Sequence, residues 1–437
     1  MFLTVLRIIN DMTKDLTKLS TEEIFSVLVA RIGNSNFELI SHNINKPDGS
    51  TGLLGDHAIL STTVNIFVDK EAQQKVLSSF TFFVKFFPTS EMQAIFCKET
   101  GAFKKEVFMY DLFETIRAAD IKYIDCVPKC YFSKANYVLV TENLVEKGYQ
   151  LLDKMNTLDY NTVLIVLKCL AKLHASSIIY EEKISNQLGK MYRLSDDRES
   201  NFEDTFYNDR EGFINIRGVE ASINALCSEV DIFQIPETLE SGKSFKETLI
   251  KQCHRVYDLV KRSNKFRNVI CHGDLWSTNF LIKLSQDNEP VDCKLIDFQC
   301  GRYLPPSHDV MALLYLTTSR EFREKHLYEV IGLYYTNLEK YLKLSNVDIS
   351  GILTIQDFLT NCEEQKLFAI FQTATYFQLI LIDDEKLEKL FSSLDGNEQT
   401  VFEDRTALIL NNMEGNTKYQ ERLKESMLDL YEFCNHL

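Results

Sequence analysis

The stretch CHGDLWSTNFLI, residues 271–282, constrains this chain most, because it sets a group of polar side chains between two apolar runs. The group holds His272, Asp274 and Asn279, together with Trp276, the only tryptophan of the chain. The runs NVI before it and FLI after it indicate buried segments on both sides. Polar side chains in such surroundings cost free energy unless they are paired or used in chemistry. The stretch therefore predicts a rigid polar turn with a chemical task.

A spacing pattern connects this turn to a second carboxylate further along the chain. Asp274 lies two residues after His272 and five before Asn279, and the apolar run KLI leads into Asp297. Phosphoryl transfer uses a carboxylate that accepts a hydroxyl proton, an amide that reaches a magnesium ion from the same loop, and a further carboxylate for magnesium. The catalytic loop of protein kinases has the same His, Asp and Asn spacing. No GxxxxGK[ST] motif is present, which excludes a Walker-type site.

A lysine inside an aromatic run supplies a possible partner for phosphate. Lys85 lies within FTFFVKFFP, where a buried charge is costly unless an anion or a carboxylate meets it. Glu106 is spaced three residues after Phe103 and four before Tyr110, which turns it toward the buried face of a helix. A Lys–Glu pair of this kind holds nucleotide phosphates in kinases. The alternative is an edge-strand lysine whose ammonium reaches water.

Hydrophobic periodicity divides the chain into two unlike parts. We expect helices over 20–32 and 99–118 and strands over 58–69, 78–88, 127–132 and 136–144, followed by long helical segments such as 161–182 and 367–382. The fold class is then α+β, with two lobes. A small N-terminal lobe, an antiparallel sheet plus a helix, is expected over 20–144, and a larger, mainly helical C-terminal lobe over 145–437.

Charge and cysteine content exclude several kinds of partner and site. The formal net charge of −15 repels phosphate backbones, so neither nucleic acid nor an anionic membrane is expected as a main partner. The 11 cysteines form no CxxC pair, which indicates reduced thiols and no zinc site. Residues 1–10 are apolar but lack the features of a signal peptide, and we find no stretch of roughly 18 to 20 apolar residues that would span a bilayer. We expect a soluble, cytoplasmic protein.

Several segments together resemble the ecdysteroid kinase-like family. They are HGDLWSTNFLIK, KLIDFQCGRY and PPSHDVMALLYL, joined by FVKFFP, FKKEVFMY and LVTENLVEKGY nearer the N-terminus. The resemblance covers roughly 20–430 and is strongest over 271–316. The family belongs to the larger group of choline- and aminoglycoside-type small-molecule kinases, which have a protein-kinase-like fold. The resemblance therefore implies this two-lobed fold.

The same resemblance implies an activity and a set of site residues. The chain is expected to use ATP and Mg²⁺ to phosphorylate a hydroxyl of a small molecule, an ecdysteroid or another hydrophobic alcohol, in hormone inactivation or detoxification. Asp274 corresponds to the catalytic base, and Asn279 and Asp297 to the magnesium ligands. Lys85 corresponds to the phosphate-binding lysine and Glu106 to its partner.

Other positions match the family's nucleotide site in part. Gly55 and Asp56 agree with the nucleotide-covering loop, GLLGDHAILS, whereas Ala58 stands where an aromatic residue is usual. The adenine edge is expected to meet the backbone between Glu142 and Leu144.

The resemblance also implies supporting roles around the catalytic turn. His272 props the turn and Asp309 ties it to the helical lobe through backbone N–H groups, while Trp276 either packs the turn against the core or lines the acceptor site. Four later aromatic residues suit an apolar acceptor but are also ordinary core residues: Tyr315, Phe371, Tyr376 and Phe377.

Two alternatives to the small-molecule kinase stay open. A catalytically silent relative that binds nucleotide or another ligand is compatible with the departure at Ala58. A protein Ser/Thr kinase is the less favoured alternative, because the chain passes from Asp297 directly to GRYLPPSHD with no APE-like segment. The sequence leaves open which alcohol is phosphorylated and the oligomeric state.

Overall fold

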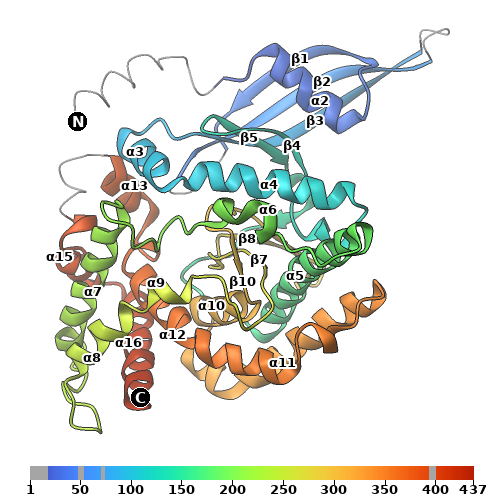
Figure 1. The fold of residues 1–437 in the computed structure, drawn as a ribbon. Coiled ribbons are helices and arrows are strands. Elements are labelled where there is room, and N and C mark those ends of the chain that lie inside the picture. The colour runs from blue at the N-terminus through green and yellow to red at the C-terminus, as the bar shows by residue number, and fades with distance from the viewer. Residues whose placement is uncertain (1–17, 48–53, 70–73, 393–399) are drawn as a thin grey trace.

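Two lobes of different construction lie one above the other in the computed structural model (Figure 1). It describes residues 18–47, 54–69, 74–392 and 400–437. The apolar N-terminus, for which we expect no targeting role, lies outside the described residues, as do Gly52 and Leu53 at the start of the expected nucleotide-covering loop.

The upper lobe is an antiparallel sheet with helices. Its elements are α2 (Thr21–Ile32), β1 (Phe37–Asn45), β2 (Asp56–Asp69), β3 (Gln74–Phe86), α3 (Glu91–Thr100), α4 (Ala102–Ala118), η1 (Lys122–Cys126), β4 (Cys130–Lys134) and β5 (Val138–Glu142). The strand order is β1-β2-β3-β5-β4, so β3 is central and has a neighbour on both sides. α4 lies between the sheet and the lower lobe (Figure 1).

The sequence explains why α2 covers one face of this sheet. Ser20 and Glu23 form a reciprocal capping box that starts the helix, and Gly33 ends it with a positive φ of 87°. The apolar face of α2 packs against alternating apolar residues of β2, β3 and β5, with Ile24 and Val27 fully buried. This packing gives the upper lobe a hydrophobic core of its own.

Three local features of the upper lobe differ from the expectation. The single helix expected over 99–118 is wrong, because Gly101 adopts a φ of 72° and separates α3 from α4. α3 and β1 were not expected at all. β1 has only one fully buried residue, so it lacks the alternation that marks a half-buried strand.

The lower lobe is mainly helical and contains two small sheets. Its elements are η2 (Val145–Lys147), β6 (Tyr149–Gln150), α5 (Tyr160–Leu188), α6 (Ser195–Arg198), η3 (Glu199–Phe202), α7 (Asn215–Ile232), α8 (Phe245–Cys253), α9 (Val256–Leu259), β7 (Val269–Cys271), β8 (Phe280–Leu284), β9 (Pro290–Leu295), β10 (Arg302–Leu304), α10 (Ser307–Thr317), α11 (Arg320–Leu344), η4 (Ile349–Gly351), α12 (Ile355–Ile380), α13 (Asp384–Ser392), α15 (Thr406–Met413) and α16 (Thr417–Asn435). The buried helix expected over 367–382 is confirmed as the second half of α12. We propose the boundary between the lobes at 144/145, where η2 follows β5.

α5 is the central helix of the lower lobe. It is long and apolar enough to cross a membrane by length and composition alone, so the expectation that no such segment exists is wrong. However, 72% of its apolar window is buried inside the fold, where it packs against α11, β7 and β9. The apolar face of α5 is therefore satisfied by the protein core.

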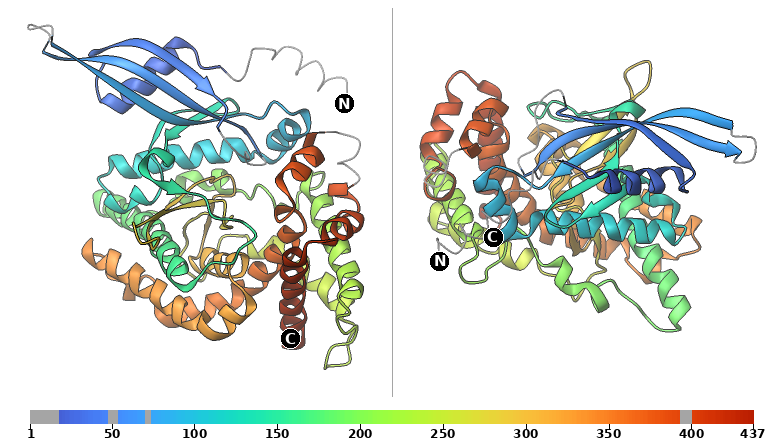
Figure 2. Two further views of the ribbon diagram at one scale, coloured as in Figure 1. Left: turned by 180° about the vertical axis from the view of Figure 1, so that it is seen from behind. Right: turned by 90° about the horizontal axis from the view of Figure 1, so that it is seen from above.

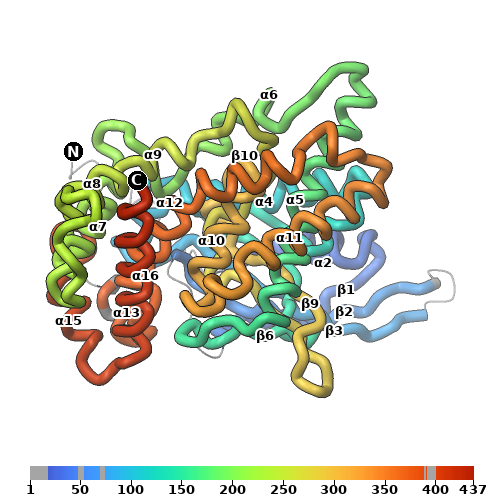
Figure 3. Tube along the Cα trace, turned by 90° about the horizontal axis from the view of Figure 1, so that it is seen from below, coloured from blue at the N-terminus to red at the C-terminus, as the bar shows by residue number. Residues whose placement is uncertain are grey.

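The remaining helices gather around this core. α10 packs on α12, and α16 packs on α12 and α8. Seen from below, α7, α8, α15 and α16 form a cluster at one end of the molecule, and α5 and α11 lie toward the other (Figure 3). The views from behind and from above show β2 and β3 extending beyond the lower lobe (Figure 2).

Two small sheets position the catalytic turn. β7 pairs with β10, and β8 lies between β6 and β9. The turn that connects β7 to β8 and the segment that follows β9 therefore start from hydrogen-bonded strands. This arrangement fixes both ends of residues 272–279 within the lower lobe.

We predict that Glu181 is a main contributor to the stability of this lobe. Its buried carboxylate pairs with Arg267 at 2.6 Å and accepts hydrogen bonds from the Tyr303 hydroxyl and the Leu194 N–H at 2.5 and 2.8 Å. Glu181→Gln should lower the free energy of unfolding by about 3 kcal/mol, because the charge of Arg267 is left buried without a full partner.

Urea denaturation measures this effect, with Glu182→Gln as the matched control. Glu182 also contacts Arg267, at 3.2 Å, but its side chain is 29% exposed, so its replacement should change stability by less than about 1 kcal/mol. Equal effects of the two substitutions would contradict the assignment of Glu181 as the stabilising residue.

Candidate functional site

The catalytic turn holds a carboxylate with one oxygen fixed and one oxygen unpaired. Asn279 Nδ2 donates to Asp274 Oδ2 and to the Asp274 main-chain oxygen, both at 2.8 Å. Asp274 Oδ1 is buried and has no hydrogen-bond partner within the described part of the chain. Gly273 has a φ of 79°, and a Cβ there would lie 2.3 Å from the Cys300 oxygen, so only glycine fits before the aspartate.

The Asp309 carboxylate holds the start of this turn. It accepts hydrogen bonds from the N–H groups of His272 and Gly273 at 2.6 and 2.9 Å, and its Oδ2 lies 3.1 Å from His174 Nε2. Burial alone would raise the pKa of Asp309, but the hydrogen bond to His174 and the nearby imidazoles lower it to about 2. The expectation that Asp309 ties the turn through backbone N–H groups is confirmed.

His272 supports the turn from inside. Its Nε2 lies 2.7 Å from the Ile296 oxygen, and its Nδ1 accepts the Asp274 N–H at 3.2 Å. Burial lowers the pKa of His272, which favours the neutral ring that these two contacts require. The expected role of His272 as a prop is confirmed, because both ring nitrogens are used within the turn and its neighbouring strand.

Lys85 connects the upper lobe to the catalytic segment. Its Nζ lies 2.7 Å from Glu106 Oε2 and 2.9 Å from Asp297 Oδ1, and the lysine is only 4% exposed. Because β3 is a central strand, the alternative of an edge-strand lysine reaching water is wrong. Burial opposes the charge, but the two carboxylates raise the pKa of Lys85 above its ordinary value.

The catalytic carboxylate lies within electrostatic reach of Asp297. Burial and then the charge of Asp297 raise the pKa of Asp274 to about 7. The Ile296 N–H donates to the Asn279 main-chain oxygen at 3.0 Å, which holds the segment after β9 against the end of the turn. The structure thus brings together five of the predicted site residues: Lys85, Glu106, Asp274, Asn279 and Asp297.

The described part of the nucleotide-covering loop begins beside Lys85. A Cβ at Gly55 would lie 2.8 Å from Lys85 Cε, so the backbone passes directly over the lysine side chain. The Asp56 carboxylate accepts the Thr89 N–H at 2.9 Å, which pins the start of β2 to the end of β3. Ala58 is buried in the core of the upper lobe, opposite Val84, so an aromatic residue is not needed to fill that core position.

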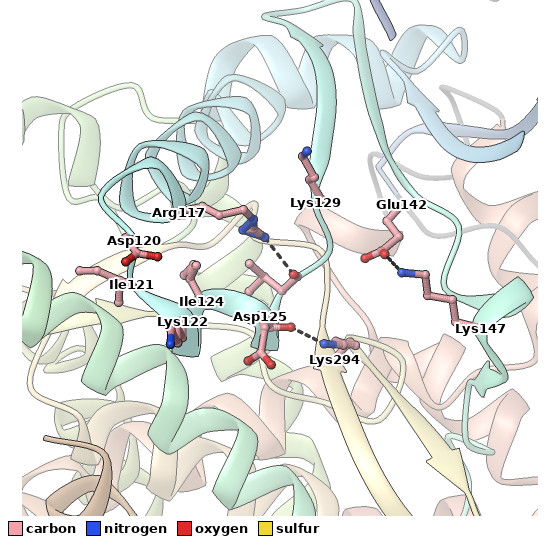
Figure 4. Close-up of a pocket in the computed structure, with 11 residues that line it drawn as sticks. Arg117, Asp120, Ile121, Lys122, Ile124, Asp125, Lys129, Glu142, Lys147 and Lys294 are labelled. Atoms are coloured by element: carbon pink, nitrogen blue, oxygen red, sulfur yellow. Dashed lines mark hydrogen bonds and ion pairs between the residues drawn. The ribbon is translucent and has the colours of Figure 1, made fainter. Parts of the chain in front are cut away.

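The two expected hinge residues face different surroundings. The Glu142 side chain pairs with Lys147 and lines a hollow of about 360 Å³ together with Arg117, Lys129 and Lys294 (Figure 4). Its carboxylate is thus engaged by a lysine of η2, and the contact of the adenine with the backbone there stays a prediction.

Leu144 lies in a small apolar cluster that sequence reasoning missed. It packs with Tyr149, Leu281 and the partly buried Ile296, which directly precedes Asp297. Leu281 lies in β8, two residues after Asn279, which ends the turn before this strand. This spacing was the available signal, whereas nothing in the sequence marks Tyr149.

The aromatic residues expected at the acceptor site differ in how far their side chains are exposed. Tyr315, Phe371 and Phe377 are at most 5% exposed and belong to the main hydrophobic core. Tyr376 is partly exposed, and its pKa is raised by burial and by the neighbouring Asp274. Trp276 is also partly exposed and packs against the core. For three of the four aromatics, the alternative of ordinary core residues is therefore confirmed.

One group of metal-ligand types lies outside the catalytic cluster. Single ligand atoms of His174, Cys271 and Asp309 lie within 4.8 Å of one another, and all three residues are buried. The His174 Nδ1 is 2.5 Å from the Tyr334 hydroxyl, and Cys271 Sγ donates to the Leu304 oxygen at 3.4 Å. Because these groups already have hydrogen-bond partners, the arrangement fits a structural polar cluster.

A sequence model of the ecdysteroid kinase-like family matches residues 57–347. The chain belongs to this family. The matched region contains Lys85, Glu106, the whole catalytic turn and Asp297. The two-lobed α+β structure, with an antiparallel sheet above a helical lobe, is the protein-kinase-like fold that the resemblance implies.

Solved structures of small-molecule kinases are similar to the chain at low identity. Choline kinase LicA from Streptococcus pneumoniae is 13% identical, covering 94% of this chain and 99% of its own, with a TM-score of 0.36. The GDP complex of aminoglycoside 2'-phosphotransferase-IIIa is 14% identical, with 96% and 99% covered and a TM-score of 0.36. These TM-scores are too low to bear on the site or the substrate. No curated protein matches the chain.

We predict that Gly55→Ala disturbs the phosphate-binding lysine. The φ of 153° at Gly55 is rarely adopted by residues with a side chain, and the new Cβ would collide with Lys85 Cε. The affinity for ATP should fall by about 10- to 100-fold, because small displacements of a positioned group are costly. Isothermal titration calorimetry measures the affinity. Gly332→Ala, at a helical position with open space, is the control, and an unchanged affinity in Gly55→Ala would contradict the prediction.

We predict that Asp309 contributes stability that depends on pH. Its pKa in the folded protein, about 2, lies below the ordinary value of 3.8, so its contribution is present above about pH 4 and is lost as the pH falls toward 2. At pH 7 Asp309→Asn should lower the free energy of unfolding by about 2 kcal/mol. Urea denaturation over a pH series checks this, with the exposed Asp287→Asn as control. A difference that stays constant down to pH 2 would argue against it.

Proposed function

We propose that the chain is a kinase that uses ATP and Mg²⁺ to phosphorylate a hydroxyl of a small molecule, of the ecdysteroid class or another hydrophobic alcohol. The observation that carries this proposal is the state of Asp274. One carboxylate oxygen is fixed by Asn279, and the other is buried with no partner among the described residues. A buried polar atom of this kind calls for a partner, and a substrate hydroxyl supplies one.

Asp274 then acts as the catalytic base. The hydroxyl of the acceptor donates a hydrogen bond to Oδ1, which orients its oxygen toward the phosphate and receives its proton during transfer. Asn279 keeps the carboxylate from rotating, because it binds both Oδ2 and the main-chain oxygen of Asp274. Asp309 and His272 hold the backbone of the turn, so the position of Oδ1 is set before the acceptor arrives.

The remaining polar residues suit a nucleotide with a divalent cation. Asp297 offers Oδ2, since Oδ1 is bound to Lys85, and Asn279 offers its Oδ1, since its Nδ2 is bound to Asp274. Oxygen donors of this kind are those that Mg²⁺ prefers, so these residues fit the ion. When bound, the ion would neutralise part of the phosphate charge. Lys85 contributes a positive charge that is held in place by Glu106.

The surroundings support a nucleotide base on one side and an apolar acceptor on the other. The cluster of Leu144, Tyr149 and Leu281 borders the segment that leads into Asp297 and gives the base an apolar surface. On the other side, Tyr376 of α12 is a partly exposed aromatic close to Asp274, and Trp276 of the turn is another. Membership of the ecdysteroid kinase-like family supports a small-molecule acceptor, and its name supports a steroid alcohol.

The test is ATP consumption by the purified protein with magnesium in the presence of ecdysteroids, other sterols, choline or a generic protein substrate. We expect turnover with a steroid alcohol, and Asp274→Asn should lower kcat by about 10²- to 10⁴-fold, because general base catalysis contributes this much. Asp287→Asn changes an exposed aspartate in the turn between β8 and β9 and should leave kcat unchanged.

Other results of this assay would favour one of the alternative functions. Binding of ATP without transfer to any acceptor would favour the silent binder, and phosphorylation of the protein substrate would favour a protein kinase. Failure to bind ATP would overturn the kinase assignment.

A further inference from the structure

A second charged residue of α4 is buried beside the catalytic cluster. Lys105 directly precedes Glu106 and is 7% exposed, whereas the preceding residue, Lys104, is exposed. Lys105 Nζ donates to the Glu203 main-chain oxygen at 2.6 Å and to the Gly301 main-chain oxygen at 3.2 Å. Neither acceptor belongs to the upper lobe, so the lysine connects α4 to two separate segments of the lower lobe.

α4 lies unusually close to the segment that follows Asp297. A Cβ at Gly301 would be 2.7 Å from Met109 Sδ, so the methionine side chain packs directly on this glycine. One residue before Met109, Phe108 meets Phe202 edge to face, with ring centroids 5.4 Å apart. The same two segments that bind Lys105 are therefore also in van der Waals contact with α4.

Residues 202–207 fasten these segments to the catalytic turn. The Asp204 carboxylate pairs with Arg302 Nε, and the Thr205 hydroxyl donates to the Gln299 oxygen at 3.0 Å. Arg302 Nη1 in turn donates to the Gly273 oxygen at 2.7 Å, next to Asp274. A continuous set of hydrogen bonds thus runs from α4 through residues 202–207 to the catalytic turn.

The charge of Lys105 is costly at this place. Burial lowers its pKa to about 8, although Asp204 partly offsets the effect, while Arg302 adds to it. The other ionisable groups that face it are Cys300 and Glu203. A methionine of similar length would fill the same space without this cost, so packing alone does not explain a lysine.

We propose that Lys105 is a positioning residue, which holds α4 at the height at which Glu106 meets Lys85. Its two carbonyl acceptors fix the helix relative to the segment that begins at Asp297. Lys85 contacts Glu106 and Asp297 at the same time, so a shift of α4 would break one of these contacts. The effect on catalysis rests on the proposed function, whereas the effect on the position of α4 does not.

Lys105→Met removes both hydrogen bonds and keeps the volume. We expect kcat to fall by about 10- to 100-fold, because Glu106 no longer holds Lys85 at the phosphates. Lys104→Met, the neighbouring exposed position of the same helix, should leave kcat unchanged. Lys105→Arg, whose guanidinium can reach both carbonyl groups, should restore part of the loss.

A double-mutant cycle separates positioning from a general structural role. If Lys105 acts through Glu106, the variant with both Lys105→Met and Glu106→Gln should have about the same kcat as Glu106→Gln alone. Two independent defects would instead multiply, and that result would overturn the proposal.

Amide hydrogen exchange of α4 tests the same proposal independently of any substrate. Lys105→Met should raise the exchange rates over Ala102–Ala118, and Lys104→Met should not. Unchanged exchange in Lys105→Met would overturn the proposal, as would raised exchange with unchanged kcat. If the wild-type protein phosphorylates no acceptor, the proposed function fails. Exchange and the affinity for ATP then decide the role of Lys105 alone.

Discussion

The contact of one buried ammonium group with two carboxylates determines how the lobes are placed. Lys85 reaches Glu106 on α4 and Asp297 after β9, so a strand, a helix and the catalytic segment meet at a single charge. A buried charge with only one partner is strongly destabilising, which means that none of the three elements can move without cost. The pairing is therefore a structural constraint, and it holds in place the lysine that we propose for the phosphates.

The catalytic turn is held by hydrogen bonds on several sides, while one carboxylate oxygen has no partner among the described residues. Asp309 takes the N–H groups at the start of the turn, His272 joins it to β9, and Asn279 binds one oxygen of Asp274. What is left over is Asp274 Oδ1, the atom at which the proposed chemistry occurs. An unpaired carboxylate oxygen beside these hydrogen-bonded groups is chemically meaningful, because buried polar groups normally have partners.

The sequence predicted those site residues that are marked by their spacing to near neighbours in the chain. His272, Asp274 and Asn279 share one turn, and Glu106 shows its buried direction through its apolar neighbours, so patterns of a few residues were enough. The break at Gly101 was missed because the apolar pattern continues across it, although the backbone turns left-handed there. The position of Tyr149 was missed because it depends on how η2 and β6 fold back onto β8.

Lys105 is a residue whose buried position could not be predicted from the sequence. A lysine that follows another lysine at the start of a helix has the pattern of a solvated surface, and nothing in FKKEVFMY separates it from Lys104. The separation comes from residues 202–207, about a hundred positions away, which present a carbonyl group to one lysine and not to the other. Residues 202–207 begin at the end of η3 and continue toward α7 without regular structure, so their docking on α4 is a property of the assembled fold. Groups that complete a site from such irregular segments become visible only when the contacts are known.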